Sequence, residues 1–147
     1  MQIETKYFGM VEIDENAIID FPEGLPGFED EKRFVLLGKQ PEQNPFVWLQ
    51  CVDCPQLAFV MIDPRTLIED YTVDVDDSEV EILDIVDTNN VLIYSIVVVP
   101  EDISKMTANL KAPVLINSVA KKGKQVILDN EEYRIRHYIM DKERTRC

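Results

Sequence analysis

Short segments rich in β-branched and aromatic residues, separated by turns that contain glycine or proline, make up most of this sequence. Several segments alternate apolar and polar residues with a period of two, and others are short apolar runs; both patterns are typical of β-strands. The longest apolar run, at residues 91–99, is typical of a central strand buried on both faces. We expect strands at residues 2–7, 10–13, 17–21, 33–37, 46–50, 57–62, 71–75, 91–99, 114–119, 125–128 and 133–139.

This succession of strands limits the fold class. Helix signals are few, and strands do not alternate with helices as they do in parallel α/β proteins. A sheet that closes on itself has no exposed edge, which favours closure in a chain built from many short strands. The sequence therefore predicts an all-β protein: a compact, single-domain, antiparallel β-barrel-like fold with one short helix.

Three local patterns refine this prediction. Residues 21–28 contain two prolines and two glycines, which predicts a turn-rich loop of fixed shape. Residues 120–124 predict a hairpin turn in which Gly123 is available for a positive φ. Ser78 and Glu81 have the spacing of a capping box, which predicts a short helix through residue 86. Its inward face would carry Val80, Leu83 and, at its end, Val86.

The charge of the chain excludes some classes of partner. The sequence has 28 acidic and 15 basic residues, a formal net charge of −13. Direct nucleic-acid binding and attraction to an anionic membrane surface are disfavoured, because both require clustered basic side chains. Residues 66–104 contain 11 acidic residues and no lysine or arginine. This segment is either a solvated face or a docking surface for a basic protein.

The location of the protein is also suggested by the sequence. The first residues lack the basic and apolar regions of a signal peptide, and the apolar run at residues 91–100 is too short to span a bilayer as a helix. Three cysteines, an odd number, do not form a secreted disulfide framework. We expect a soluble, cytoplasmic protein that is monomeric when free.

The pair Cys51 and Cys54 has the spacing of a redox dithiol. However, Asp53 between them would oppose a thiolate, and an apolar strand follows where a redox fold would place a helix. A structural zinc site needs four ligands, and only His137 and Cys147 remain as further candidates. We therefore expect no cofactor and no metal. A small redox or metal-binding protein that uses Cys51 and Cys54 remains the alternative.

No motif requires an enzyme. The sequence contains no nucleophile elbow, phosphate-binding loop or dinucleotide-binding glycine pattern. Members of a catalytic triad meet in space and leave no fixed sequence spacing. We expect a protein without catalytic residues.

Seven motifs, in order along the chain, resemble the flagellar assembly factor FliW family. They are Ile-Glu-Thr-Lys-Tyr-Phe-Gly at residues 3–9, Phe-Pro-Glu-Gly-Leu-Pro-Gly-Phe at 21–28, Asn-Pro-Phe with Trp-Leu-Gln within 44–50, Pro-Glu-Asp at 100–102, Met-Thr-Ala-Asn-Leu-Lys-Ala-Pro at 106–113, Gly-Lys-Gln-Val at 123–126 and Arg-His at 136–137. We expect residues 1–139 to form the FliW-like β domain and residues 140–147 to form a flexible tail. Cys51 and Cys54 depart from the family pattern, which usually has serine or aspartate types in this segment.

The resemblance implies a function as well as a β-barrel-like fold. It implies a cytoplasmic bacterial protein, not an enzyme, that binds flagellin and, when freed by flagellin export, binds the RNA-binding translational regulator CsrA. Binding would relieve the repression of flagellin translation by CsrA. The family is described as an allosteric antagonist that acts away from the RNA-binding surface of CsrA.

A candidate partner-binding surface follows from charge, an aromatic residue and one of these motifs. Acidic side chains would meet a basic partner, and tyrosine is enriched among interface hot spots. The motif at residues 106–113 presents apolar and amide groups suited to a protein contact. The predicted partner-binding residues are Glu69, Asp70, Tyr71, Asp74, Ile103, Met106 and Asn109. The loop 21–28 and Trp48 are assigned to folding, because aromatic residues among turns and strands usually pack.

Overall fold

The computed structural model describes residues 1–38 and 45–140. Its strands are β1 (Gln2–Glu4), β2 (Met10–Glu12), β3 (Ile19–Asp20), β4 (Arg33–Leu37), β5 (Phe46–Cys51), β6 (Ala58–Ile62), β7 (Val91–Val98), β8 (Thr107–Ala108), β9 (Val114–Asn117), β10 (Lys122–Gln125) and β11 (His137–Tyr138). Within the described residues the only α-helix is α1 (Asp77–Val80). The 3-10 helices are η1 (Glu15–Ala17), η2 (Pro64–Thr66), η3 (Glu81–Leu83), η4 (Thr88–Asn90) and η5 (Ile103–Lys105).

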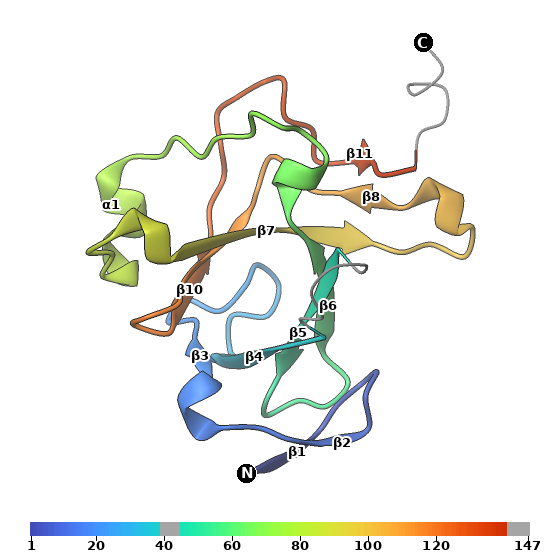
Figure 1. Cartoon of the computed structure of the whole chain (residues 1–147), viewed down its shortest axis with the longest axis vertical. Coiled ribbons are helices and arrows are strands. Elements are labelled where there is room, and N and C mark those ends of the chain that lie inside the picture. The colour runs from blue at the N-terminus through green and yellow to red at the C-terminus, as the bar shows by residue number, and fades with distance from the viewer. Residues whose placement is uncertain (39–44, 141–147) are drawn as a thin grey trace.

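Seven strands form a closed barrel in the order β7, β6, β5, β4, β3, β10 and β9, and β9 pairs back with β7 (Figure 1). Strand β7 closes it because its first half pairs with β9 and its second half with β6. The predicted all-β barrel with one short helix is confirmed. One contact departs from the antiparallel prediction: β3 and β10 pair in parallel, with Lys122 opposite Asp20.

The interior of the barrel is filled by alternate residues of its strands, as expected when a sheet closes around an apolar core. The Pro/Gly-rich loop contributes Phe21, which is fully buried and lies edge-on to Phe34 at 5.2 Å between ring centroids. Gly123 faces this ring so closely that a Cβ on it would be 2.4 Å from Phe21 Cζ. The glycine is required for close packing.

The predicted hairpin is confirmed, since β9 and β10 pair in antiparallel. Its turn, however, lies at earlier residues than predicted. The turn occupies residues 118–121, and the positive φ, 59°, is at Lys121. Gly123 lies within β10, which covers Lys122–Gln125 and not the predicted residues 125–128. The pattern at residues 120–124 contains the only glycine of the hairpin, and sequence reasoning assigned it to the turn. Its actual role depends on Phe21, a hundred residues earlier.

A second core lies outside the barrel, between the outer faces of β7 and β9 and the segments that cover them. Tyr71 and Tyr133 meet here at 4.5 Å between ring centroids, and both are buried. The hydroxyl of Tyr71 donates to the Leu110 carbonyl at 2.6 Å, and the hydroxyl of Tyr133 accepts from the Thr72 amide at 3.0 Å. The predicted strand at residues 71–75 is therefore wrong, because side chains rather than ladder hydrogen bonds hold this segment.

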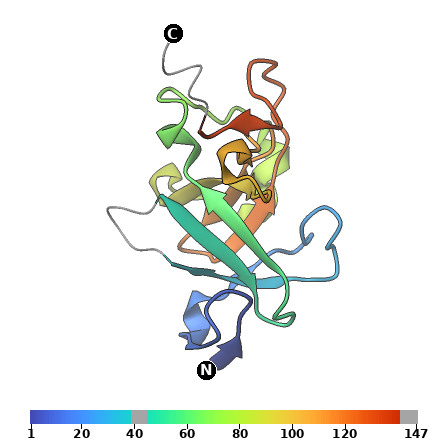
Figure 2. The same ribbon diagram turned by 90° about the vertical axis from the view of Figure 1, so that its right-hand side faces the viewer.

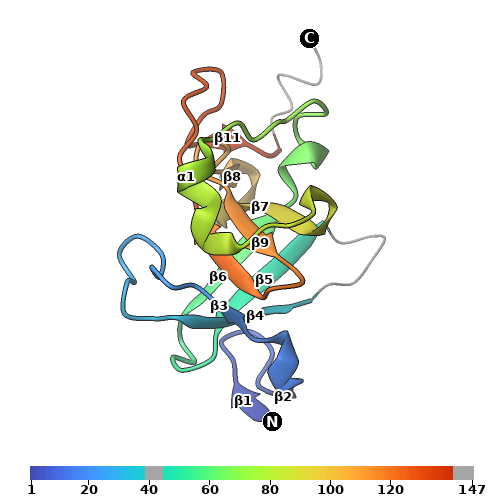
Figure 3. The ribbon, with the colours of Figure 1, turned by 90° about the vertical axis from the view of Figure 1, so that its left-hand side faces the viewer.

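The predicted helix is shorter than expected and begins differently. Residue Asp76, not Ser78, is the N-cap of α1, and it makes no side-chain capping bond. The helical turns end at Asp84, whose φ is +54°, and there the Asn117 side chain donates to the carbonyls of Leu83 and Asp84. These bonds tie the chain to the β9–β10 hairpin, beside which α1 lies (Figure 3). Leu83 is buried as predicted, but Val86 is 99% exposed.

The strands predicted at the two ends of the chain are also shorter. The alternation at residues 2–7 predicts a longer strand than β1, since the chain turns at residues 5–9. The prediction for residues 133–139 reduces to β11. The tail predicted at residues 140–147 lies outside the described residues except for Met140.

Candidate protein-docking site

The turn after β1 presents two aromatic side chains to solvent. The Thr5 hydroxyl donates to the Gly9 carbonyl at 2.7 Å and accepts from the Phe8 amide at 2.9 Å. Gly9 closes the turn with a φ of +66°. Tyr7 is 52% exposed and Phe8 is 42% exposed. A contiguous exposed apolar patch, more than a single exposed ring, is what indicates a contact surface.

Gln50 fastens this turn to the barrel. Its side-chain oxygen accepts from the Lys6 amide at 3.0 Å, and its side-chain nitrogen donates to the carbonyls of Cys51 and Pro55 at 3.0 and 3.1 Å. The residue is 1% exposed, so this polar group is buried and satisfied. Sequence reasoning missed it, although a lone polar residue in the apolar run of β5 was a usable signal.

An apolar groove of about 400 Å³ lies beside these aromatic rings. Phe8 packs edge-on against Trp48, with 5.3 Å between centroids and 86° between planes. We call this surface the aromatic groove; its lining residues are Tyr7, Phe8, Phe46, Trp48, Val60, Val99 and Met106. Figure 2 views the side of the molecule where β5 and β6 lie between the N-terminal hairpin and the connection from β7 to β8.

The connection from β7 to β8 borders the aromatic groove and adds acidic groups. Val99 and Met106 line the groove, and Ile103 between them is 58% exposed. Asp102 caps η5 by accepting from the amide and the hydroxyl of Ser104, which lowers the pKa of its carboxyl group. Exposed apolar groups with a charged rim are typical of a protein contact surface.

A separate hollow of about 490 Å³ carries acidic side chains. Its lining residues are Asp74, Val75, Asp76, Glu79, Ile127, Asp129 and Asn130, and we call it the acidic hollow. Its carboxylates form one negative surface, and Lys124 lies at its border, 3.8 Å from Glu79 Oε1. In Figure 1, α1 lies near the start of β7, whereas the β7–β8 connection lies beyond its other end. The acidic hollow and the aromatic groove are thus distinct surfaces.

The structure distributes the predicted partner-binding residues over these two regions. Glu69, Asp70 and Asp74 are exposed in the acidic segment, and only Asp74 lines the hollow. Met106 lines the aromatic groove, and Ile103 is exposed in the connection between β7 and β8 that borders it. The prediction did not include Tyr7 and Phe8, although their motif was identified.

Two of the predicted residues have structural roles. Tyr71 is 5% exposed and hydrogen-bonded inside the second core, so its expected use as an aromatic anchor on the surface is corrected. Within the described residues, the segment 71–75 pairs with no neighbouring strand, so side-chain packing holds this segment in place, and the apolar ring of Tyr71 is buried as part of that packing. The Asn109 side-chain oxygen accepts from the amides of Lys111 and Ala112, which fixes the local turn.

Cys51, the first cysteine of the predicted dithiol pair, has a structural role. Cys51 is fully buried in the barrel, and its thiol donates to Glu31 Oε1 at 3.4 Å. Burial, together with this contact, raises the pKa of the Cys51 thiol to about 11. Asp53, expected to oppose a thiolate, is paired with Arg33 at 2.6 Å, which lowers its pKa. A reactive thiolate needs the opposite environment.

We expect iodoacetamide to label Cys54 well before Cys51 at pH 8. With a pKa of about 11, roughly one Cys51 thiol in a thousand is ionised at that pH. Peptide mapping by mass spectrometry after timed quenching measures each site, including Cys147, which lies outside the described residues. Labelling of Cys51 as fast as Cys54 would contradict the buried, protonated state.

Residues 1–38 and 45–140 contain no group of three or more histidine, cysteine, aspartate or glutamate side chains placed to hold a metal ion. None of the helices in that part of the chain has the length and apolar character needed to cross a membrane.

The closed barrel and its exposed contact surfaces define the class: a small all-β protein with a surface suited to binding other proteins. The model of the FliW protein family matches residues 2–139. A flagellar assembly factor FliW from Thermoanaerobacter pseudethanolicus is 50% identical over 96% of this chain and 94% of its own length. The FliW of Caldanaerobacter subterraneus is 47% identical over the same shares.

A solved structure agrees with this match. A crystal structure of the flagellar assembly factor FliW superposes with a TM-score of 0.87, at 42% identity, covering 96% of this chain and 98% of that one. The chain belongs to the FliW family of flagellar assembly factors. The resemblance seen in the seven sequence motifs is therefore confirmed.

Proposed function

We propose that this flagellar assembly factor binds flagellin and, once flagellin has been exported, binds CsrA and relieves its repression of flagellin translation. It acts in the cytoplasm, as a monomer when free, by exchanging protein partners and without catalysis. The observation that carries this proposal is the aromatic groove, whose exposed rings have no role in closing the barrel core.

The aromatic groove is the surface we assign to flagellin. Tyrosine and tryptophan supply much of the binding energy at interfaces when they sit in pockets that exclude water. Tyr7 and Trp48 both line the groove, and Lys6 lies 5.4 Å from the Tyr7 ring centroid. Met106 lines the same groove, and we assign the exposed Ile103, in the connection that borders it, to the same contact.

The acidic hollow and the adjoining segment are the surface we assign to CsrA. A protein that binds RNA carries basic groups, and complementary charge speeds encounter and improves specificity. Asp74, Asp76 and Glu79 come from one short segment and give this surface its charge. We assign Glu69 and Asp70, which are exposed in the preceding part of the chain, to CsrA binding as well.

We expect Asp74→Lys to weaken CsrA binding about threefold to tenfold at low salt, because it replaces attraction by repulsion. The difference from the unchanged protein should shrink as salt is raised. Isothermal titration calorimetry of CsrA into each protein, at low and moderate salt, measures both effects.

Asp30→Lys is the matched control. Asp30 is an exposed carboxylate in the loop 21–32, and its replacement by lysine changes the net charge by the same amount as Asp74→Lys does. Equal weakening by both substitutions would mean that only net charge matters. Unchanged affinity with Asp74→Lys, in a folded protein, would remove the acidic hollow from the CsrA interface.

The redox alternative is less well supported. Cys51 is buried with a raised pKa, and replacing both cysteines with alanine should leave partner binding unchanged. Loss of binding in a folded double variant would favour a role for the thiols.

A further inference from the structure

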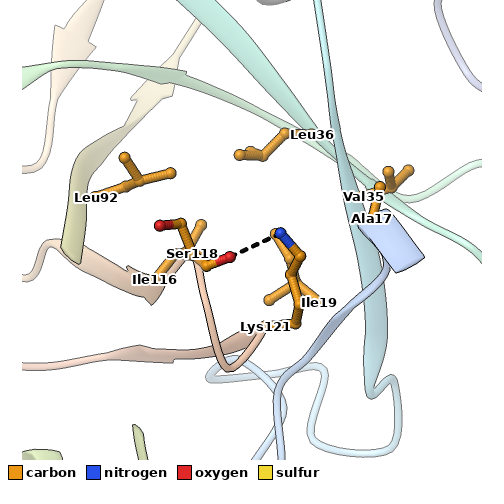
Figure 4. Close-up of a pocket in the computed structure, with 8 residues that line it drawn as sticks. All are labelled: Ala17, Ile19, Val35, Leu36, Leu92, Ile116, Ser118 and Lys121. Carbon is orange, nitrogen blue, oxygen red and sulfur yellow. Dashed lines mark hydrogen bonds between the residues drawn. The ribbon is translucent and has the colours of Figure 1, made fainter. Parts of the chain in front are cut away.

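A pocket of about 190 Å³ lies at one end of the barrel interior, and its lining shares no residue with either surface described above (Figure 4). Its apolar walls come from β3, β4, β7 and β9, and the principal side chains are Ile19, Leu36, Leu92 and Ile116. Its polar border is the turn between β9 and β10, which contributes Ser118 and Lys121. The mouths of β-barrels are common sites for small ligands.

Lys121 supplies the positive charge at this pocket. Its ammonium group donates to the Ser118 carbonyl at 2.7 Å, the contact drawn as a dashed line in Figure 4. An ammonium group has three donors, so this one bond leaves two for another acceptor. The Ser118 hydroxyl is already used, because it donates to the Asn90 carbonyl at 2.8 Å.

The two lysines that follow Lys121 in the chain are paired with carboxylates, and within the described residues Lys121 is not. Lys122 is paired with Asp84 at 2.7 Å, and Lys124 lies 3.8 Å from the carboxylates of Glu23 and Glu79. Within residues 1–38 and 45–140, no carboxylate lies within 4.0 Å of the Lys121 ammonium.

The backbone holds Lys121 in a fixed position. Its amide donates to the Asn117 carbonyl and its carbonyl accepts from the Asp20 amide, both at 2.8 Å. Its φ of 59° is in the left-handed region, where glycine or asparagine is the more usual residue. The turn itself does not need a lysine, whereas the pocket gains an anchored ammonium from it.

We propose that this pocket binds a small aliphatic carboxylate. The carboxylate would accept from the Lys121 ammonium, and the hydrocarbon part would lie against Ile19, Leu92 and Ile116. A cavity of about 150 Å³ holds a benzene molecule, so the present pocket has room for about six to eight non-hydrogen atoms. Hexanoate and isovalerate are acids of this size. Inorganic anions match the charge but leave the apolar walls unused.

Titration of the full chain with hexanoate and with hexanamide tests the proposal. The two ligands have the same shape and differ in charge, so hexanoate should bind at least about tenfold more tightly. Two-dimensional amide NMR spectra should show shifts at Ile19, Leu92 and Ile116 with hexanoate. The affinity ratio follows from the shifts measured at increasing concentrations of each ligand.

Two variants locate the site. Lys121→Gln should bring hexanoate to the affinity of hexanamide, while Lys105→Gln, at an exposed lysine outside the pocket, should leave it unchanged. Leu92→Phe fills the pocket and should remove both ligands. If Lys121→Gln does not fold, the comparison of hexanoate with hexanamide on the unchanged protein still tests whether the pocket prefers a carboxylate.

Equal affinities for hexanoate and hexanamide, shifts confined to other residues, or unchanged hexanoate binding by a folded Lys121→Gln variant would each overturn the proposal. So would the absence of any shift at millimolar hexanoate. These outcomes do not involve flagellin or CsrA, so the proposal stands or fails separately from the proposed function.

Discussion

Phe21→Ala is expected to lower the free energy of unfolding by about 3–5 kcal/mol, the usual cost of removing a fully buried aromatic ring. Phe21 fills the barrel interior against Phe34, and Gly123 is a glycine because this ring lies next to it. Urea denaturation followed by the fluorescence of Trp48, the sole tryptophan, measures the loss.

Phe28→Ala is the matched control, because Phe28 belongs to the same Pro/Gly-rich loop but is 42% exposed. Its ring contacts Phe59 at 5.6 Å between centroids, and its removal should cost about 1 kcal/mol. Similar losses for the two variants would mean that the loop acts as a unit and that the Phe21–Gly123 contact has no special weight in the barrel.

Tyr7→Ala is expected to raise the dissociation constant for flagellin about thirtyfold or more, the effect of removing an interface hot spot. The side chain is half exposed on a turn that Thr5 and Gln50 hold in place, so its removal should leave the barrel intact. Calorimetric titration with monomeric flagellin measures the affinity, and urea denaturation checks the fold.

Val119→Ala provides the comparison for this variant. Val119 is an apolar side chain, 70% exposed, in the turn between β9 and β10 and outside the aromatic groove. Its replacement should leave flagellin affinity unchanged. If Tyr7→Ala binds flagellin as tightly as Val119→Ala does, the aromatic groove is not the flagellin surface.

Strands β4 to β7 of the barrel were predictable because their signals are local. The limits of β4 are those predicted, residues 33–37, and β5, β6 and β7 differ from prediction by one residue at one end. In each, side chains that alternate between two buried faces or form a short apolar run determine the strand. The displaced hairpin turn and the shortened helix depended instead on distant partners, Phe21 for Gly123 and Asn117 for Asp84.

The candidate site was predictable only in part for the same reason. Charge along residues 66–104 indicated an acidic surface, and the motif at 106–113 led to Met106. Tyr71 was misplaced because nothing in its neighbourhood reveals that it pairs with Tyr133, sixty-two residues later. Tyr7 was missed because the aromatic groove forms only when the N-terminal turn packs beside β5, through Gln50.

Partner exchange is the central claim, and one titration tests it most directly. Calorimetry should show that monomeric flagellin binds the purified protein and that CsrA binds it as well. CsrA added to protein already saturated with flagellin should then give little heat, because exchange requires that flagellin bound at the aromatic groove excludes CsrA from the separate acidic hollow. Full, undiminished CsrA binding to the flagellin complex would contradict exchange, and failure of either partner to bind the free protein would contradict the proposed function.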